Sequence, residues 1–455
     1  MEQNLFNLLA SFEDILWGYI AFPLLIILGL YFSLSTGFVQ IRQFPRVVKT
    51  FFGFMKIKDQ ESRGVHPLKA FFACIGGCVG VGNLVSICTA VQFGGPGALF
   101  WIWITAIFGM MIKYAEVYLG LIYRVPNAEG GYNGGPMYFL QAAFPWKWVG
   151  SIAALLLCIY GVEVFQFSVV VQSVSYNWGL NSYLVALVLL GLVLYAGNGG
   201  VRRVGNISSA IIPAFVFLYL GMGIWVLFLH RDKIPEMLFT ILQSAFTGHA
   251  AFGGFIGSTL IMTISQGLRR GCYSGDIAVG YASVINSETS VQVPQKQASL
   301  EFLGIAIDTF LICTTSIMLI LVTEIWHQPI EVGLLVQTAL QPHFSYMNYF
   351  MPFFLFLLGY STINAYFVAG LKCAEYLSPT KGKKYFFSYA VIALFTFSFV
   401  ETIHAQSVMA IAGGLLLVIN SIGIFRLRKQ VKFDFAEAEF TLIHEATSPH
   451  KITSI

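Results

Sequence analysis

The sequence is poor in charge. Only 11% of its 455 residues are Asp, Glu, Lys or Arg, against about 25% in an average soluble protein. Hydrophobic residues make up 57% of the chain, and the mean hydropathy is +0.74. This composition excludes an ordinary soluble protein and indicates an all-α polytopic membrane protein in contact with the lipid bilayer. No nucleic-acid partner is expected.

Reactive groupings are also scarce. The chain has only seven cysteines, and none lies in a predicted outer loop, so we expect small apolar packing residues rather than disulfides or metal ligands. No His–Glu, Ser–His or Cys–His grouping clusters in the apolar segments, which disfavours an enzyme. No soluble signalling domain is attached, which disfavours a sensor. The first fifteen residues contain no Lys or Arg, unlike a signal peptide, so the first apolar span is expected to stay.

Eleven apolar stretches are long enough to cross a bilayer as helices of about 20 residues. They are residues 15–34, 68–92, 97–123, 149–176, 182–198, 205–229, 243–268, 299–323, 348–374, 384–400 and 404–426. With the N-terminus outside and the C-terminus cytoplasmic, Arg269, Arg270, Lys113 and most other basic residues fall on the inner side. Only Arg231 and Lys233 then lie outside. We therefore predict a multi-pass protein of the plasma (bacterial inner) membrane.

The second span contains the stretch GGCVGVGN, residues 76–83. A glycine costs roughly 1 kcal/mol against alanine in a helix interior, so four glycines in seven positions indicate a broken helix. Unwound backbone is tolerated at membrane depth where it is buried in protein or lines a wet cavity. Its carbonyls can bind a cation, and half-helix N-termini can face a carboxylate. The alternative is close helix packing through a Gly-x-x-x-Gly pattern.

A second glycine-rich stretch, with Gly253, Gly254 and Gly257, lies in the seventh span. Without the first span, the remaining ten divide into five and five, and each half begins with a glycine-interrupted helix. Such a pair is typical of inverted-repeat transporters. We predict an N-terminal extra helix and basic loop (1–67), two five-helix repeats (68–230 and 243–426) and a cytoplasmic tail (427–455).

Several motifs resemble those of one transporter family. Residues 94–109 read GGPGALFWIWITAIFG, and the stretches GVGNLVSICTAV, GGYNGGPMYFL, FGGFIGS, QGLRRG, IDTFLICT and STIN occur in the family's order. The chain thus resembles the alanine or glycine:cation symporters, also called sodium:alanine symporters, of the amino acid–polyamine–organocation superfamily. The resemblance implies a ten-helix inverted-repeat fold and secondary transport.

Four departures from the family pattern fall near the expected site. Val81 replaces a usual Thr, Tyr366 stands where a Trp is expected, and Glu163 stands where an Asn is usual. The stretch YSGDIA, residues 273–278, replaces a Phe followed by SNEAG. We expect these changes to affect the substrate or coupling ion more than the fold.

An amino acid needs donors for its carboxylate, acceptors for its ammonium and a pocket of limited size. The backbone and amide of the first broken helix suit these needs, and by resemblance Gln166 contacts the substrate. The predicted substrate-binding residues are Gly80, Val81, Gly82, Asn83, Gln166, Phe252, Gly253 and Tyr366. The alternatives are interhelical hydrogen bonding for Gln166 and ordinary packing for the two aromatic residues.

Sodium is the expected co-transported ion, and no organic cofactor is expected. By analogy with the fold, its ligands are the carbonyls of Gly76, Val79 and Leu358 and the hydroxyls of Ser361 and Thr362. The alternative is that the two hydroxyls bond back to their own helix.

Three further ionisable features lie in the spans. Glu163, near the face of Gln166, is predicted to bind the cation or to take a proton. Asp308 has either a functional or a structural hydrogen-bonding role. Lys113 and Glu116, three residues apart, are interpreted as a helix-surface pair.

Together these features predict a monomeric carrier, not an enzyme, that imports alanine or glycine with sodium by alternating access. The alternative is a proton-coupled or exchange carrier of the same fold for another small amino acid.

Overall fold

The structure is a computed structural model that describes residues 2–57, 63–247 and 260–434. Most of these residues lie in helices. Within the described ranges, the strands are β1 (Val125–Pro126) and β2 (Tyr132–Asn133), which form one short antiparallel pair. The predicted all-α architecture is therefore confirmed.

Within the described residues, seven helical segments are long and apolar enough to cross a membrane. They are Leu8–Ser35, Ala98–Ile122, Trp148–Trp178, Gly200–Leu229, Pro294–Val322, Met347–Leu377 and His404–Arg426. An eighth span is broken: Pro67–Cys78 and Val81–Gly94 meet at an angle of 48°. Two of the eleven expected spans, 182–198 and 384–400, correspond to shorter helices, and a third, 243–268, lies partly outside the described residues, so the count of eleven and the inverted repeat remain predictions.

Several of these segments consist of more than one element. The first contains α1 (Glu2–Ile15), a π-helical turn (Leu16–Ala21) and α2 (Phe22–Ser35), and the third contains α9 (Trp148–Tyr160) and α10 (Val164–Trp178). The fifth contains α16 (Pro294–Ile305), a π-helical turn (Ala306–Cys313) and α17 (Thr314–Val322). The broken span contains α5 (Pro67–Cys78), a 3-10 turn (Val81–Asn83) and α6 (Ser86–Gly94).

The remaining helices complete the bundle. The long ones are α7 (Ala98–Ile122), α12 (Gly200–Leu229), α19 (Met347–Leu377) and α21 (Thr402–Arg426). Those of intermediate length are α4 (Phe44–Phe54), α11 (Ser182–Gly197), α13 (Ile234–Thr247), α14 (Leu260–Gly275) and α20 (Gly382–Phe397). The short ones are α3 (Val39–Arg42), α8 (Pro136–Ala143), α15 (Tyr281–Asn286), α18 (Leu335–Leu340) and 3-10 turns at Arg231–Lys233, Ile325–His327, Val332–Leu334 and Arg428–Gln430.

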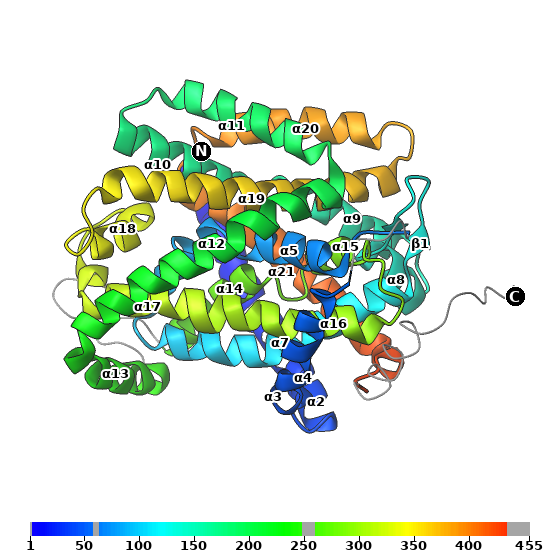
Figure 1. Cartoon of the computed structure of the whole chain (residues 1–455), viewed down its shortest axis with the longest axis horizontal. Coiled ribbons are helices and arrows are strands. Elements are labelled where there is room, and N and C mark those ends of the chain that lie inside the picture. Colours follow the sequence, from blue (N-terminus) through cyan, green and yellow to red (C-terminus); the bar gives the residue numbers. More distant parts are fainter. Residues whose placement is uncertain (1, 58–62, 248–259, 435–455) are drawn as a thin grey trace, which may run out of the picture.

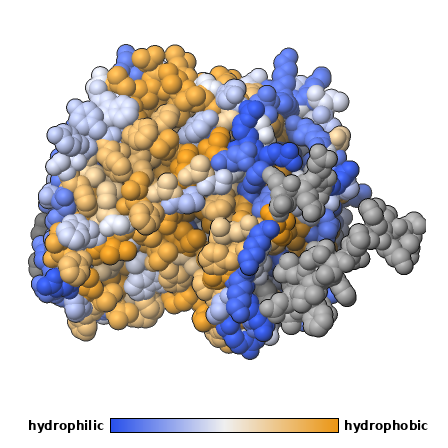
Figure 2. All heavy atoms as spheres, viewed as in Figure 1, coloured by the Kyte–Doolittle hydropathy of each residue, from blue (hydrophilic) through white to orange (hydrophobic). Residues whose placement is uncertain are grey.

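The surface of the bundle is apolar along the helix flanks. Figure 2 shows hydrophobic atoms over the middle of the visible face and hydrophilic atoms gathered toward the helix ends. Large apolar side chains project outward; Phe217, for example, is 81% exposed and Ile392 is 67% exposed. Such a surface is stable against lipid tails rather than water. The chain is therefore a multi-pass membrane protein.

The interrupted helix α5 lies in the interior of the bundle, with α11 and α20 along one edge and α7 toward the other (Figure 1). It packs against α12 and α19, and α14 packs against both α6 and α7. Its start is fixed locally, because Pro67 occupies the first turn and the His66 ring accepts a hydrogen bond from the Leu68 amide at 3.2 Å. This packing places the glycine-rich stretch at the centre of the protein.

The structure corrects the position of two basic residues. Arg269 and Arg270 are not in an inner loop; both are buried within α14. Arg269 bonds to the carboxylates of Glu13 at 2.8 Å and Asp14 at 2.5 Å. Arg269 therefore joins α14 to the N-terminal helix α1, which contains Glu13 and Asp14. The predicted placement of the N-terminus outside and the C-terminus inside therefore depends on the other Lys and Arg residues.

Candidate functional site

The first interruption, residues 79–85, separates α5 from α6. Val79 and Gly80 are extended, and a 3-10 turn follows. The freed Gly80 amide donates to the Asn83 side-chain oxygen at 2.8 Å, and the Val81 amide donates to Gln166 Oε1 at 3.2 Å. A Cβ added to Gly80 would lie 2.6 Å from the same Gln166 oxygen, so only glycine fits. The predicted broken helix is confirmed.

A second interruption, residues 276–280, separates α14 from α15. Asp276 and Ala278 have φ angles of 49° and 58°, and Gly280 has a φ of 99°. Left-handed conformations are unfavourable for the two non-glycine residues, so contacts must hold them. The Asn420 side chain donates to the Ala278 carbonyl at 2.9 Å, and Lys113 donates to the Gly275 carbonyl at 2.8 Å.

The glycines at 253, 254 and 257 predict a second interruption in the seventh span instead. Phe252 and Gly253 lie outside the described residues, so neither the predicted break there nor their substrate-binding role is tested. The glycine pattern does not predict the interruption at residues 276–280, although the stretch YSGDIA, which overlaps it, departs from the family pattern. The signal in the sequence is an acid between two glycines in an otherwise nearly uncharged segment.

The two interruptions contact each other. The Asn83 amide nitrogen donates to Ser274 Oγ at 3.0 Å, at the end of α14, and the Cys78 thiol donates to Asp276 Oδ2 at 3.2 Å. Asp308 lies beside this contact and accepts from Asn83 at 2.5 Å and from Ser274 at 3.0 Å. Asp308 thus has the hydrogen-bonding role that was one of its two predicted roles.

Glu163 and Gln166 lie at the start of α10, next to the first interruption. Glu163 is fully buried with a φ of 45°, and its two carboxylate oxygens each accept from the Tyr273 hydroxyl at 3.2 Å. The Tyr273 ring would lie 3.4 Å from a Cβ on Gly82. Gly80, Val81, Gly82, Asn83 and Gln166, all predicted to bind substrate, therefore lie together. Glu163 and Tyr273, both departures from the family pattern, bond to each other beside them.

Tyr366, also predicted to bind substrate, belongs to a different cluster. Its hydroxyl makes a short hydrogen bond to Asp276, and its ring centre lies 5.3 Å from that of Tyr160 and 4.3 Å from that of Tyr281. Tyr366 is buried at the second interruption and has no hydrogen bond to the first. Sequence reasoning did not identify Asp276 or Tyr160 as part of this cluster.

Four of the five predicted sodium ligands converge where α19 packs against α5. The Thr362 hydroxyl donates to the Gly76 carbonyl at 2.9 Å and lies 3.5 Å from the Val79 carbonyl. Ser361 shares a hydrogen bond of 2.8 Å with Ser208, and its hydroxyl would lie 2.9 Å from a Cβ on Gly76. Leu358, the fifth, is buried one turn earlier in α19. The atoms brought together are neutral oxygens, the donor type that suits sodium at such sites.

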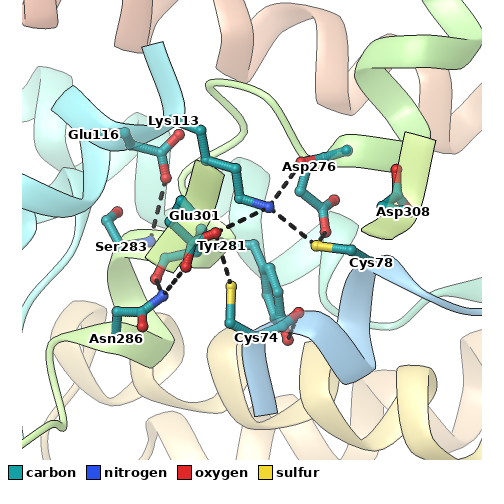
Figure 3. Close-up of polar contacts among 12 residues, drawn as sticks. Cys74, Cys78, Lys113, Glu116, Asp276, Tyr281, Ser283, Asn286, Glu301 and Asp308 are labelled. Atoms are coloured by element: carbon teal, nitrogen blue, oxygen red, sulfur yellow. Dashed lines mark hydrogen bonds and ion pairs between the residues drawn. The ribbon is translucent and has the colours of Figure 1, made fainter. Parts of the chain in front are cut away.

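The interpretation of Lys113 and Glu116 as a surface pair is wrong. Both side chains are buried, and they do not bond to each other. Lys113 Nζ lies 3.3 Å from Glu301 Oε2 and donates to Cys78 Sγ at 3.1 Å (Figure 3). Glu116 instead accepts from the Ser283 amide at 3.2 Å. Spacing on a helix shows which residues share a face, but not whether that face meets lipid, water or other helices.

A cavity of about 820 Å³ leads toward the first interruption from one end of the bundle. Its lining runs from Val85 and Phe165, next to the interruption, to Glu331 and Glu401 at helix ends. Val85 ends the first interruption and Phe165 precedes Gln166 in α10, so the inner part of the cavity lies close to the predicted substrate-binding residues without being lined by them.

Polar contacts, rather than a cavity, are found around the loop that follows α15. Arg124 donates to the carbonyls of Ser287, Thr289 and Val291 at 2.7–3.1 Å, and Lys372 makes a short ion pair with Glu288. The end of the bundle that contains this loop is therefore held together by hydrogen bonds and an ion pair, whereas the other end contains the cavity.

Comparison with solved structures identifies the fold. MhsT in complex with L-phenylalanine superposes with a TM-score of 0.56 at 14% identity, over 85% of this chain and 100% of MhsT. The inward-facing conformation of Mhp1 gives a TM-score of 0.50 at 14% identity, over 82% and 79% of the two chains. At such low identity these likenesses show the fold alone.

Relatives in sequence are transporters. An uncharacterized transporter of Haemophilus influenzae is 30% identical over 93% of this chain and 94% of its own. A probable sodium/glutamine symporter of Bacillus subtilis, GlnT, is 29% identical over 95% and 90%. The sodium/alanine symporter AgcS of Methanococcus maripaludis is 28% identical over 92% and 94%.

A family profile described as the sodium:alanine symporter family matches residues 2–441, nearly the whole chain. With the helical fold and the interrupted helices at its centre, this protein is a cation-coupled amino acid transporter, not an enzyme. The chain belongs to the sodium:alanine symporter family.

Proposed function

We propose that this protein is a secondary active transporter that imports small neutral amino acids, alanine or glycine in D or L form, with sodium. The observation that supports this most directly is the meeting of the two interrupted helices beside Gln166 and Asn83. Unwound backbone and neutral amides offer both donors and acceptors, as a zwitterionic substrate requires. The name of the relative AgcS, a sodium/alanine symporter, points to the same substrate class.

The substrate carboxylate would take the amide donors of the first interruption, and the ammonium would take the Gln166 oxygen and the Glu163 carboxylate. Val81 and the Tyr273 ring would limit the space for a side chain. A small residue such as alanine suits this arrangement, because the surrounding groups contact one another and leave little room for a larger side chain.

Sodium would bind where Thr362 and Ser361 face the carbonyls of Gly76 and Val79, with Leu358 completing the ligands. Bound there, it would fix the end of α5 against α19. Because Gly80 follows directly, sodium binding would order the substrate-binding backbone, and each ligand would raise the affinity for the other.

Alternating access would then move the interrupted helices against the rest of the bundle. The cavity that reaches Phe165 would be the outer entrance, with the N-terminus outside and the C-terminus in the cytoplasm. The loop held by Arg124 and Lys372 would be the closed inner end. We propose that a single chain performs the whole cycle in a plasma (bacterial inner) membrane.

A specific observation supports a second candidate, a proton-coupled or exchange carrier of the same fold for another small amino acid. Glu163 places a buried carboxylate beside Gln166, and this carboxylate accepts a hydrogen bond from the Tyr273 hydroxyl. A carboxylate so placed can carry a proton or a cation through the membrane. The name of the relative GlnT, a probable sodium/glutamine symporter, also indicates that relatives of this chain differ in the amino acid they carry.

The test is uptake of labelled glycine, L-alanine and D-alanine into proteoliposomes under a sodium gradient, a proton gradient or neither. Sodium-driven accumulation of any of the three is expected. Proton-driven uptake without sodium, abolished in Glu163→Gln, would favour the second candidate. Uptake of none of the three under any gradient would contradict the proposed substrates.

A further inference from the structure

Lys113 is a charged side chain in the interior of a membrane protein. It lies within α7, far from either end of the helix, and is 1% exposed. A charge at this depth is expensive unless several groups compensate it. The groups that surround Lys113 therefore indicate the role of its charge.

The ammonium of Lys113 makes two hydrogen bonds and one ion pair, to groups on three different elements. It donates to the Cys78 sulfur at 3.1 Å and to the Gly275 carbonyl at 2.8 Å, and it lies 3.3 Å from Glu301 Oε2 on α16. An ammonium has three donors and no acceptor, and each of these three groups offers it an acceptor atom. The Lys113 ammonium is therefore surrounded by acceptor atoms, as a bound cation would be.

Two of these partners are the last residues of the interrupted helices. Cys78 ends α5 and Gly275 ends α14, so the ammonium lies beside the ends of both helices and experiences the field of the α14 C-terminus directly, through the Gly275 carbonyl. A helix C-terminus carries a partial negative charge equivalent to roughly half an elementary charge. In transporters with broken helices, such ends and the unwound carbonyls next to them coordinate cations.

The acidic side chains around Lys113 strengthen this field. Glu301 pairs with it directly, while the Asp276 carboxylate is linked to it through the Cys78 thiol, which donates at 3.2 Å (Figure 3). Glu301 is held in turn by Asn286, which donates at 2.9 Å. Among the ten side chains labelled in Figure 3, Lys113 is the only cation facing this group of carboxylates.

We propose that Lys113 is a tethered cation, which fills a cation-binding position between the two interrupted helices that would otherwise take a free monovalent ion. Because the ammonium is covalently fixed to α7, this position is occupied throughout the transport cycle. Lys113 is thus a positioning residue: it holds the ends of α5 and α14 together without contacting the substrate. This inference rests on the proposed cation-coupled function but concerns a position separate from Thr362 and Ser361.

The consequence is a gain of sodium binding when the tether is removed. Lys113→Met keeps the length of the side chain and leaves Glu301, the Gly275 carbonyl and the two helix ends without a cation. Sodium then takes the vacated position. We expect transport by Lys113→Met to require several-fold more sodium, and the Hill coefficient for sodium to rise by about one.

The measurement is the thermal unfolding midpoint of the purified full-length protein as sodium replaces choline at constant ionic strength. A ligand that binds only the folded protein raises this midpoint, so the readout does not require transport. Sodium is expected to raise the midpoint more for Lys113→Met than for the unmodified protein. Uptake of labelled alanine into proteoliposomes gives the Hill coefficient.

Two variants make the result specific. Lys113→Met with Glu301→Gln removes the carboxylate as well, so the additional sodium effect should disappear. Lys233→Met also breaks a lysine–glutamate pair, with Glu324 at 2.7 Å, but that pair is exposed, and the variant should respond to sodium as the unmodified protein does.

Equal sodium responses of Lys113→Met and the double variant would overturn the proposal, leaving Lys113 as one half of a structural ion pair. If Lys113→Met unfolds in choline, recovery of its folded state by sodium supports the proposal, whereas no recovery at any sodium concentration while the double variant folds contradicts it. Absence of any sodium effect on the unmodified protein would instead count against the proposed sodium coupling.

Discussion

The two interrupted helices solve the same problem with different chemistry. At the first interruption the backbone is freed by glycine and satisfied by nearby amides: Asn83 bonds to the Gly80 amide and Gln166 to the Val81 amide. At the second, Asp276 and Ala278 take left-handed conformations that other helices must hold in place. The first depends on small size, whereas the second depends on distant contacts.

This difference predicts how each interruption fails. A conformation that needs the absence of a side chain is destroyed by adding one atom. A conformation that needs several external contacts weakens in steps as each contact is removed. The expected effects therefore decrease from the first interruption to the second.

The largest effect is expected for Gly80→Ala. The added Cβ would overlap Gln166 Oε1, which lies 2.6 Å away, and the Thr362 hydroxyl even more closely. Overpacking costs up to about 3 kcal/mol, and about 1.4 kcal/mol corresponds to tenfold, so sodium-driven alanine uptake should fall by about a hundredfold. The matched control is Gly191→Ala in α11, where no atom lies within 4 Å of the added Cβ, and uptake should not change. Near-normal uptake by Gly80→Ala would show that the first interruption does not depend on the size of this residue.

The next largest effect is expected for Asp276→Asn. The carboxylate accepts hydrogen bonds from the Tyr366 hydroxyl and the Cys78 thiol, and an amide nitrogen placed at either position would face a donor. A hydrogen bond to a charged group contributes about 1.5–3 kcal/mol, so uptake should fall by about tenfold or more. Tyr366→Phe removes one of these donors and should have a smaller effect. A larger loss from Tyr366→Phe than from Asp276→Asn would indicate that Tyr366 acts on the substrate rather than on Asp276.

These two interruptions also mark what the sequence could and could not reveal. Glycine is the direct cause of the first, so the GGCVGVGN stretch predicted it, and Gln166 and Asn83 could be placed beside it. The second is held by Asn420 and Lys113, which are far away in sequence. No local pattern contains those contacts, and the glycines at 253–257 gave a stronger but different signal.

The same reason explains the errors for single charged residues. Lys113 and Glu116 have the spacing of a surface pair, and Arg269 and Arg270 have the composition of an inner loop. Their burial results from the packing of α7 and α14 against partners that periodicity does not identify. The family resemblance could supply the fold and the transport function, because its motifs extend along most of the chain.

A smaller effect is expected for Arg124→Gln, which tests the link between the ends of the two interrupted helices. Arg124 holds the loop after α15 through three carbonyls, and that loop pairs with Val65, just before α5, through Thr289. Glutamine can replace only part of these bonds, and each contributes about 1 kcal/mol. The thermal unfolding midpoint should fall by a few degrees, while Arg42→Gln, which loses one exposed bond of 3.3 Å, should be neutral. An unchanged midpoint for both variants would mean that the loop is held by the Lys372–Glu288 pair alone.

The smallest effect, of opposite sign, is expected for Ala278→Gly. Ala278 has a φ of 58°, where an alanine Cβ costs about 1 kcal/mol and glycine is free of strain. Its carbonyl would keep the hydrogen bond from Asn420, so the variant should unfold at a midpoint higher by about a degree or two, with uptake retained. Ala282→Gly, at the second residue of α15, is the matched control and should lower the midpoint, because glycine costs about 1 kcal/mol within a helix. If both substitutions lowered the midpoint equally, the contacts around the second interruption would favour the left-handed alanine itself, and the two interruptions would depend on side-chain fit to the same degree.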